Sequence, residues 1–119
     1  MLGLRREDVP KAIDGNGVEF RKQSLGEMTV AFVRADKGTD LRPVLQGLPD
    51  NLCPCPHWGY VIKGKVRMHM KDGQADYEAG QAFYWAPGHA PEMLEDTEYV
   101  DFSPTQEIDA VIRHITGQA

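Results

Sequence analysis

The sequence concentrates potential metal ligands in one short segment, Cys-Pro-Cys-Pro-His at residues 53–57. Because Cys53, Cys55 and His57 occupy alternate positions, an extended backbone would project all three side chains from one face. The prolines between them hold the segment extended and cannot donate ladder hydrogen bonds, which is typical of a sheet edge or a barrel rim. Thiolates and imidazoles bind zinc, copper or iron, so one interpretation is a transition-metal site. The other is a pair of small buried thiols beside a core histidine.

The elements that would position these residues are mainly strands. Residues 65–71 alternate apolar and cationic side chains and end at an Asp-Gly pair, a strong hairpin signal. From Val18 onward the pattern is strand-like, and the clearest further strands are predicted at 28–33, 58–62, 75–78, 83–85 and 99–102. Residues 4–14 are predicted to form a short helical turn or an arm, and the acidic stretch 92–98 a solvated loop.

Only the C-terminus has a helical pattern. Ser103 is predicted as the N-cap and Pro104 as the first helical residue. An apolar stripe at helical spacing follows, formed by Ile108, Val111, Ile112 and Ile115. The sequence therefore predicts an all-β barrel or sandwich over residues 18–103, a C-terminal α-helix over 105–116, and a single domain over 1–119.

Charge and composition exclude several classes of function. The net charge of −5 is the wrong sign for a protein whose main partner is a nucleic acid. The longest apolar run, residues 82–86, is far shorter than the roughly 20 residues of a membrane helix, and the charged N-terminus does not resemble a secretory signal. Two closely spaced cysteines are poorly placed for a mutual disulfide, so we expect reduced thiols and a cytoplasmic location.

Two further segments resemble a known family. Residues 60–66, Tyr-Val-Ile-Lys-Gly-Lys-Val, resemble the strand and glycine of the first cupin motif, and residues 80–89 resemble the second. The resemblance covers about residues 25–103 and includes the hairpin between the motifs. It implies a cupin-type jelly-roll barrel with a metal or ligand pocket in its mouth. We also expect a homodimer, because a small barrel has exposed edge strands and cupins commonly pair through them.

The metal positions of both motifs depart from the family pattern. The first cupin motif carries His-x-His and then a glutamate, but His57 stands at the glutamate position, and Cys53 and Asn51 stand at the histidine positions. In the second motif Pro91 occupies the histidine position, and His89 lies two residues earlier. The usual set of three histidines and one glutamate therefore does not carry over.

The resemblance instead implies a repositioned set of metal ligands at the mouth of the barrel. The candidates are Cys53, Cys55, His57 and His89. Cysteine and histidine together suit zinc first, with iron, nickel or copper as alternatives. A vestigial site that holds no metal remains the other interpretation.

Candidate contacts to a small-molecule ligand lie on the same strands. Trp58, Tyr84 and Trp85 could line a pocket, although aromatic residues on strands more often form a core or a dimer contact. Arg67 and His69 belong to a period-two basic row that is typical of a solvated strand face. A register shift at the preceding glycine would instead turn both residues inward, where they could pair with an anionic ligand.

Two functions follow as hypotheses. The first is a metal-dependent cupin enzyme acting on a small organic molecule by oxygen chemistry, isomerisation or decarboxylation. The second is a non-catalytic module that binds or senses a small molecule, with or without a metal. A redox-active cysteine pair is a third and more distant hypothesis, since both cysteines share a rigid segment.

Overall fold

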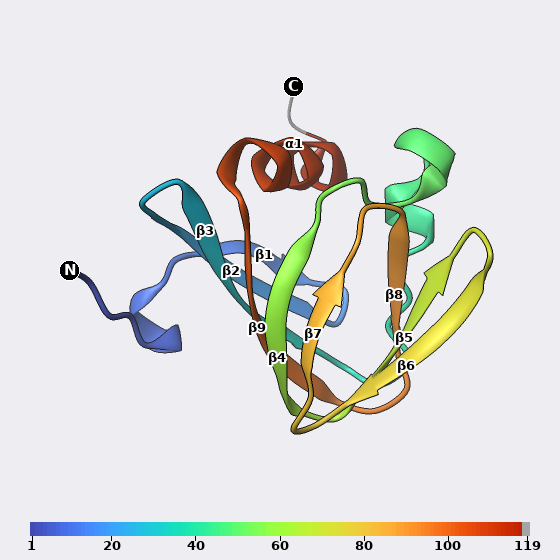
Figure 1. The fold of residues 1–119 in the computed structure, drawn as a ribbon, viewed down its shortest axis with the longest axis horizontal. Helices are drawn as coiled ribbons and strands as arrows, with labels where there is room; N and C mark the ends of the chain where they lie inside the picture. Colours follow the sequence, from blue (N-terminus) through green and yellow to red (C-terminus); the bar gives the residue numbers. More distant parts are fainter. Residues whose placement is uncertain (118–119) are drawn as a thin grey trace.

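The computed structural model describes residues 1–117, which form nine β-strands in two antiparallel sheets and one C-terminal α-helix (Figure 1). The larger sheet has the order β1-β2-β3-β9-β4-β7, and the smaller sheet the order β6-β5-β8. The strands are β1 (Lys11–Gly15), β2 (Val18–Leu25), β3 (Met28–Ala35), β4 (His57–Lys63), β5 (Lys65–Met70), β6 (Gly73–Glu78), β7 (Ala82–Trp85), β8 (His89–Met93) and β9 (Thr97–Pro104). The all-β prediction with one terminal helix is confirmed.

The C-terminal helix α1 (Thr105–Thr116) has the predicted bounds and lies at one end of the two sheets (Figure 1). Three residues of its apolar stripe, Ile108, Val111 and Ile112, are buried in a cluster with Leu45 and Ala90. The predicted cap is wrong, because the N-cap is Pro104 and no side chain caps the helix. Ser103 instead stays in β9, where its hydroxyl contacts a buried histidine.

Three short 3₁₀ helices complete the described elements: η1 (Arg6–Asp8), η2 (Pro43–Leu45) and η3 (Pro49–Asn51). No helix in the described part of the chain is long and apolar enough to cross a membrane.

Strand β9 lies at the centre of the larger sheet, paired with β3 on one side and β4 on the other. Its alternate residues, Thr97, Tyr99, Asp101 and Ser103, are all buried. A strand projects every second side chain to the same face, so β9 places a carboxyl group and three hydroxyl groups in the interior. Of these, Asp101 and Ser103 lie beside the start of β4, whereas Thr97 lies near its end.

Two glycines allow β4 to fit into this arrangement. At Gly59 any side chain would collide with the carbonyl oxygen of Val100 on β9 and with the ring of Phe83 on β7. Gly64 has a φ of +87° and turns the chain from the larger into the smaller sheet, next to Asp96. Such a φ is easily adopted only by glycine. Gly59 thus lets the start of β4, where His57 lies, pack closely against β9 and β7.

Two segments that were not predicted as strands form strands in the structure. Residues 11–15, predicted as part of a turn or an arm, form β1 and pair with β2, so the barrel begins before residue 18. Residues 89–93 form β8, so Glu92 lies in a strand and not in a solvated loop. β1 is mostly polar and half exposed, and β8 contains Pro91, so neither carries a strand pattern.

Candidate metal centre

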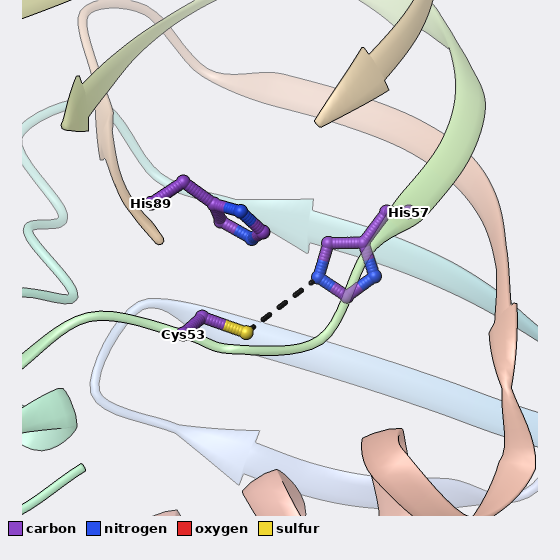
Figure 2. A group of neighbouring side chains, drawn as sticks. All are labelled: Cys53, His57 and His89. Atoms are coloured by element: carbon purple, nitrogen blue, oxygen red, sulfur yellow. Dashed lines mark hydrogen bonds between the residues drawn. The ribbon is translucent and has the colours of Figure 1, made fainter. Parts of the chain in front are cut away.

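Three of the predicted ligands come together at the open end of the two sheets. Cys53 lies in the loop before β4, His57 is the first residue of β4, and His89 is the first residue of β8. The main chain holds the loop against β8, since the amide of Cys53 donates to the carbonyl of His89 at 2.8 Å. The carbonyl of Cys53 in turn accepts from the amide of Gly88 at 2.8 Å. Figure 2 shows the three side chains converging on one point.

The distances suit a small cation. The ligand atoms of Cys53, His57 and His89 all lie within 4.8 Å of one another, and all three residues are buried. The sulfur of Cys53 is 3.8 Å from Nε2 of His57 (Figure 2). Tetrahedral zinc, with bonds of about 2.0–2.3 Å, separates neighbouring ligand atoms by about 3.5 Å. A small contraction would therefore complete a coordination site.

Hydrogen bonds at the far side of each imidazole orient the rings. Nδ1 of His89 is 2.6 Å from the carbonyl oxygen of Ala86, which can only accept, so the proton of this ring lies on Nδ1. Nδ1 of His57 is 2.6 Å from Oγ of Ser103. Both rings thus have their Nδ1 atoms hydrogen-bonded, so Nε2 is the nitrogen left to bind a metal, and Nε2 of His57 already faces the sulfur of Cys53. This is how the outer partners of metal-binding histidines fix the ligating nitrogen.

Burial controls the charge of the group. Burial lowers the pKa of His57 to about 3, with the neighbouring His89 adding to the effect. The pKa of His89 is lowered by burial as well. Burial raises the pKa of the Cys53 thiol to about 11. At neutral pH the imidazoles are therefore in the form that binds metals, whereas a cation must displace the proton of Cys53.

The fourth predicted ligand, Cys55, lies outside this group. Its sulfur contacts the carbonyl of Pro56 at 3.5 Å, and the residue belongs to the apolar cluster beneath α1. Burial raises the pKa of the Cys55 thiol to about 12. The alternation argument fails here because residues 54–56 are not part of a strand. Cys55 shares the buried cluster with Cys53, but its sulfur is not among the grouped ligand atoms.

The predicted ligand contacts lie away from the group as well. Trp58 and Tyr84 stack on each other at 5.1 Å on the outer face of the larger sheet and are both exposed. Arg67 forms an ion pair with Asp76 at 2.9 Å. No register shift turns it inward, and the basic row behaves as a solvated face.

His69 contacts Glu92 at 2.8 Å on the smaller sheet. Like Trp58, Tyr84 and Arg67, it does not line the cavity beside the metal group.

That cavity has a volume of about 760 Å³ and runs between the sheets to α1. Cys53, His57 and His89 form part of its wall, and Trp85 and Asp101 line it beside them. Burial raises the pKa of the Asp101 carboxyl to about 8, and one of its oxygens is 3.9 Å from Nδ1 of His57. The sequence pattern had suggested a pocket role for Trp85, but Asp101 and Ser103 were missed. Their alternation with Tyr99 on a predicted strand was the available signal.

Several solved structures have a similar fold. No protein-family model and no curated protein matches the sequence. KdgF from Halomonas sp. is similar over 84% of this chain and 90% of its own, with a TM-score of 0.61 and 22% identity. An RmlC-like cupin from Shewanella frigidimarina is similar over 87% of this chain and 90% of its own, with a TM-score of 0.62 and 17% identity. At these identities the likeness establishes the fold.

A variant of oxalate decarboxylase from Bacillus subtilis is also similar, with a TM-score of 0.65 and 17% identity. The match covers 85% of this chain but 28% of the decarboxylase chain. The similarity is thus between this chain and one part of the much longer decarboxylase chain.

Proposed function

Because the chain has the cupin fold, we propose that it is a metal-binding cupin that holds a transition metal, zinc first, through Cys53, His57 and His89. We propose further that it binds or acts on a small organic molecule in the adjoining cavity. The observation that carries the proposal is the convergence of the three ligand atoms within 4.8 Å, with Nδ1 of both rings already hydrogen-bonded.

The donor set supports a site with one open position. Two imidazoles and one thiolate provide three protein ligands, and catalytic zinc typically has three, with water or substrate as the fourth. When bound there, zinc would polarise a carbonyl oxygen as a Lewis acid. The chain's own residues orient the rings through Ser103 and the carbonyl of Ala86, and the buried wall keeps bulk water from the group.

The test is metal content and affinity of the full chain. Purified protein stripped with chelator and titrated with zinc or cobalt should bind one equivalent, and the cobalt form should show a thiolate-to-metal charge-transfer band. Replacing His57 by Ala should abolish stoichiometric binding. His69→Ala is the matched control, because His69 is a half-buried histidine with a polar partner and lies outside the group.

Failure to bind zinc, cobalt, iron, nickel or copper would overturn the metal function. The chain would then be proposed as a non-catalytic binding module, which the cavity favours on its own. Its volume of about 760 Å³ falls within the usual range for small-molecule sites, roughly 300–1,000 Å³.

A further inference from the structure

The side chains that line the cavity indicate which kind of molecule it can hold. They are formed mainly by apolar side chains from both sheets and from α1, including Phe20, Val33, Met68, Met93 and Ile112. Within residues 1–117, none of the residues that line the cavity is Lys or Arg. A buried anion without a cationic partner is strongly disfavoured, because desolvation of the charge is not offset. Without a bound metal, the interior is therefore unsuited to carboxylates and phosphates.

The rim does not reverse this preference. Its two carboxylates, Asp14 and Asp40, are paired with Lys11 and Arg42, and neither cation is among the lining residues. Among the described residues, the rim therefore adds no lining cation that would attract an anionic ligand.

Two side chains that line the cavity each carry a buried polar atom without a hydrogen-bond partner. Within the described part of the chain, Nε1 of Trp85 and Oδ1 of Asp101 are buried side-chain atoms without one. Trp85 is 3% exposed and Asp101 2% exposed, and both line the cavity. A buried polar group without a partner is destabilising, so a ligand that supplies the missing hydrogen bond binds more tightly than one that does not. The indole N–H can only donate, so it selects a ligand with an acceptor.

These groups stand next to the metal ligands. The ring of Trp85 is 6.3 Å from the rings of both His57 and His89, centroid to centroid. An oxygen acceptor that hydrogen-bonds to the indole is thereby held near the three ligand atoms, and the remainder of the molecule lies against the apolar walls.

We propose that the cavity takes an uncharged, largely apolar small molecule with a carbonyl-type oxygen, which accepts a hydrogen bond from Nε1 of Trp85. The placement of that oxygen near a metal rests on the proposed function. The preference for a neutral ligand does not, because it follows from the walls alone.

Three matched probes test the proposal by calorimetric titration: 2-acetylnaphthalene, the anionic 2-naphthoate, and 2-ethylnaphthalene, which lacks an acceptor. We expect the ketone to bind the chelator-treated protein at least about tenfold more tightly than the carboxylate. We also expect it to bind about threefold to tenfold more tightly than the hydrocarbon, which leaves the indole unpaired. Equal or tighter binding of the carboxylate, or no measurable binding of the ketone, would overturn the proposal.

The sequence has two tryptophans, which provides an internal control. In ¹⁵N-labelled protein the indole N–H signal of Trp85 should move downfield with the ketone, while that of the exposed Trp58 stays in place. Trp58→Phe assigns the two signals and should leave ketone affinity unchanged. Trp85→Phe should lower it about threefold to tenfold, and unchanged affinity in this folded variant would contradict the proposed hydrogen bond.

A second variant keeps the test decisive if Trp85→Phe does not fold. Ala35 is buried and lines the cavity, so Ala35→Leu should reduce ketone binding at least tenfold by filling the space. Ala82→Leu, on the exposed side of β7, is its control. Repeating the titrations with zinc-loaded protein separates the two proposals. Ketone binding without zinc binding would refute the metal function alone, and the reverse result would refute the inference alone.

Discussion

On strands β4 and β7, the pair of rings that faces the interior lies one residue from a pair that faces outward. His57 is opposite Trp85 in the ladder, and both are buried. The next pair, Trp58 and Tyr84, is 45% and 53% exposed. Because side chains alternate across a strand, neighbouring residues of similar chemistry belong to different surfaces. The inner pair borders the metal group and the cavity, while the outer pair forms part of an exposed aromatic face.

The largest expected difference between the two faces is in stability. Trp85→Ala should lower the free energy of unfolding by about 3–5 kcal/mol, because it removes a buried ring and leaves a larger cavity. Trp58→Ala should cost about 1 kcal/mol or less, since its ring is half exposed. Urea denaturation followed by circular dichroism measures both. Similar losses in the two variants would show that the outer stack is as important to the fold as the inner ring.

The next contrast concerns the two cysteines. Cys53→Ser should weaken zinc binding about 100-fold or more, because a hydroxyl is a far poorer zinc ligand than a thiolate. Cys55→Ser should change the affinity less than about threefold, since Cys55 lies outside the group of ligand atoms. Competition with a chromophoric chelator gives both values. A comparable loss in Cys55→Ser would mean that the 53–57 loop rearranges to bring both sulfurs to the metal.

A third prediction contrasts Asp101, inside β9, with its exposed neighbour Phe102. Because the pKa of Asp101 is raised to about 8 from an ordinary 3.8, the folded state holds this proton more tightly than the unfolded state. The wild-type protein therefore loses stability from this group as the pH rises between about 4 and 8. Asp101→Asn lacks that ionisation, so its stability relative to the wild type should rise over the same window.

The gain should reach about 1–3 kcal/mol above pH 8 and vanish near pH 4, where both side chains are neutral. Thermal melts of chelator-treated protein at pH 4, 6 and 9 measure it. A gain that is constant with pH would show that the effect is packing and not ionisation. Phe102→Leu, on the outer face of the same strand, should show no such dependence.

The fold could be predicted because its signals are local. Alternation in residues 65–71, the hairpin signal at Asp72-Gly73 and the stripe on α1 each require only neighbouring residues. The structure has the strand over 65–70, the hairpin, with its turn at Lys71 and Asp72, and the helix. Strand β8 was missed because Pro91 and Glu92 hide its pattern, although tertiary pairing with β5 forms it. Local propensity gives no signal for a strand that is stabilised by its partner.

The candidate site could be predicted only in part for the same reason. The sequence motifs placed Cys53, His57 and His89 at the mouth of the barrel, and the structure brings them together. Asp101 and Ser103 were not predicted, because their proximity to His57 depends on the pairing of β9 with β4, more than 40 residues away in the chain. Cys55 lies outside the group of ligand atoms, because the strand alternation that links it to Cys53 does not apply to residues 54–56, which are not in a strand.

The outer face of the larger sheet leads to the last prediction, a homodimer. Five large side chains on β4, β7 and β9 are exposed there: Trp58, Tyr60, Ile62, Tyr84 and Phe102. Trp58 lies directly opposite both Tyr84 and Phe102 in the ladder, so these side chains form a continuous patch. Exposed apolar patches of this kind often mark protein–protein contacts, and aromatic residues dominate their binding energy. We therefore propose that two copies pair through this face.

Light scattering should give a mass near twice 13.3 kDa at high concentration. Trp58→Lys should weaken the dimer about tenfold or more, because it places a charge at the centre of the contact. Met70→Lys is the matched control, as Met70 is 40% exposed but lies on β5, in the other sheet. A 13.3 kDa species at all concentrations, or equal weakening by both substitutions, would refute pairing through this face. The exposed pair, Trp58 and Tyr84, would then have no proposed role, whereas the buried pair would still line the cavity.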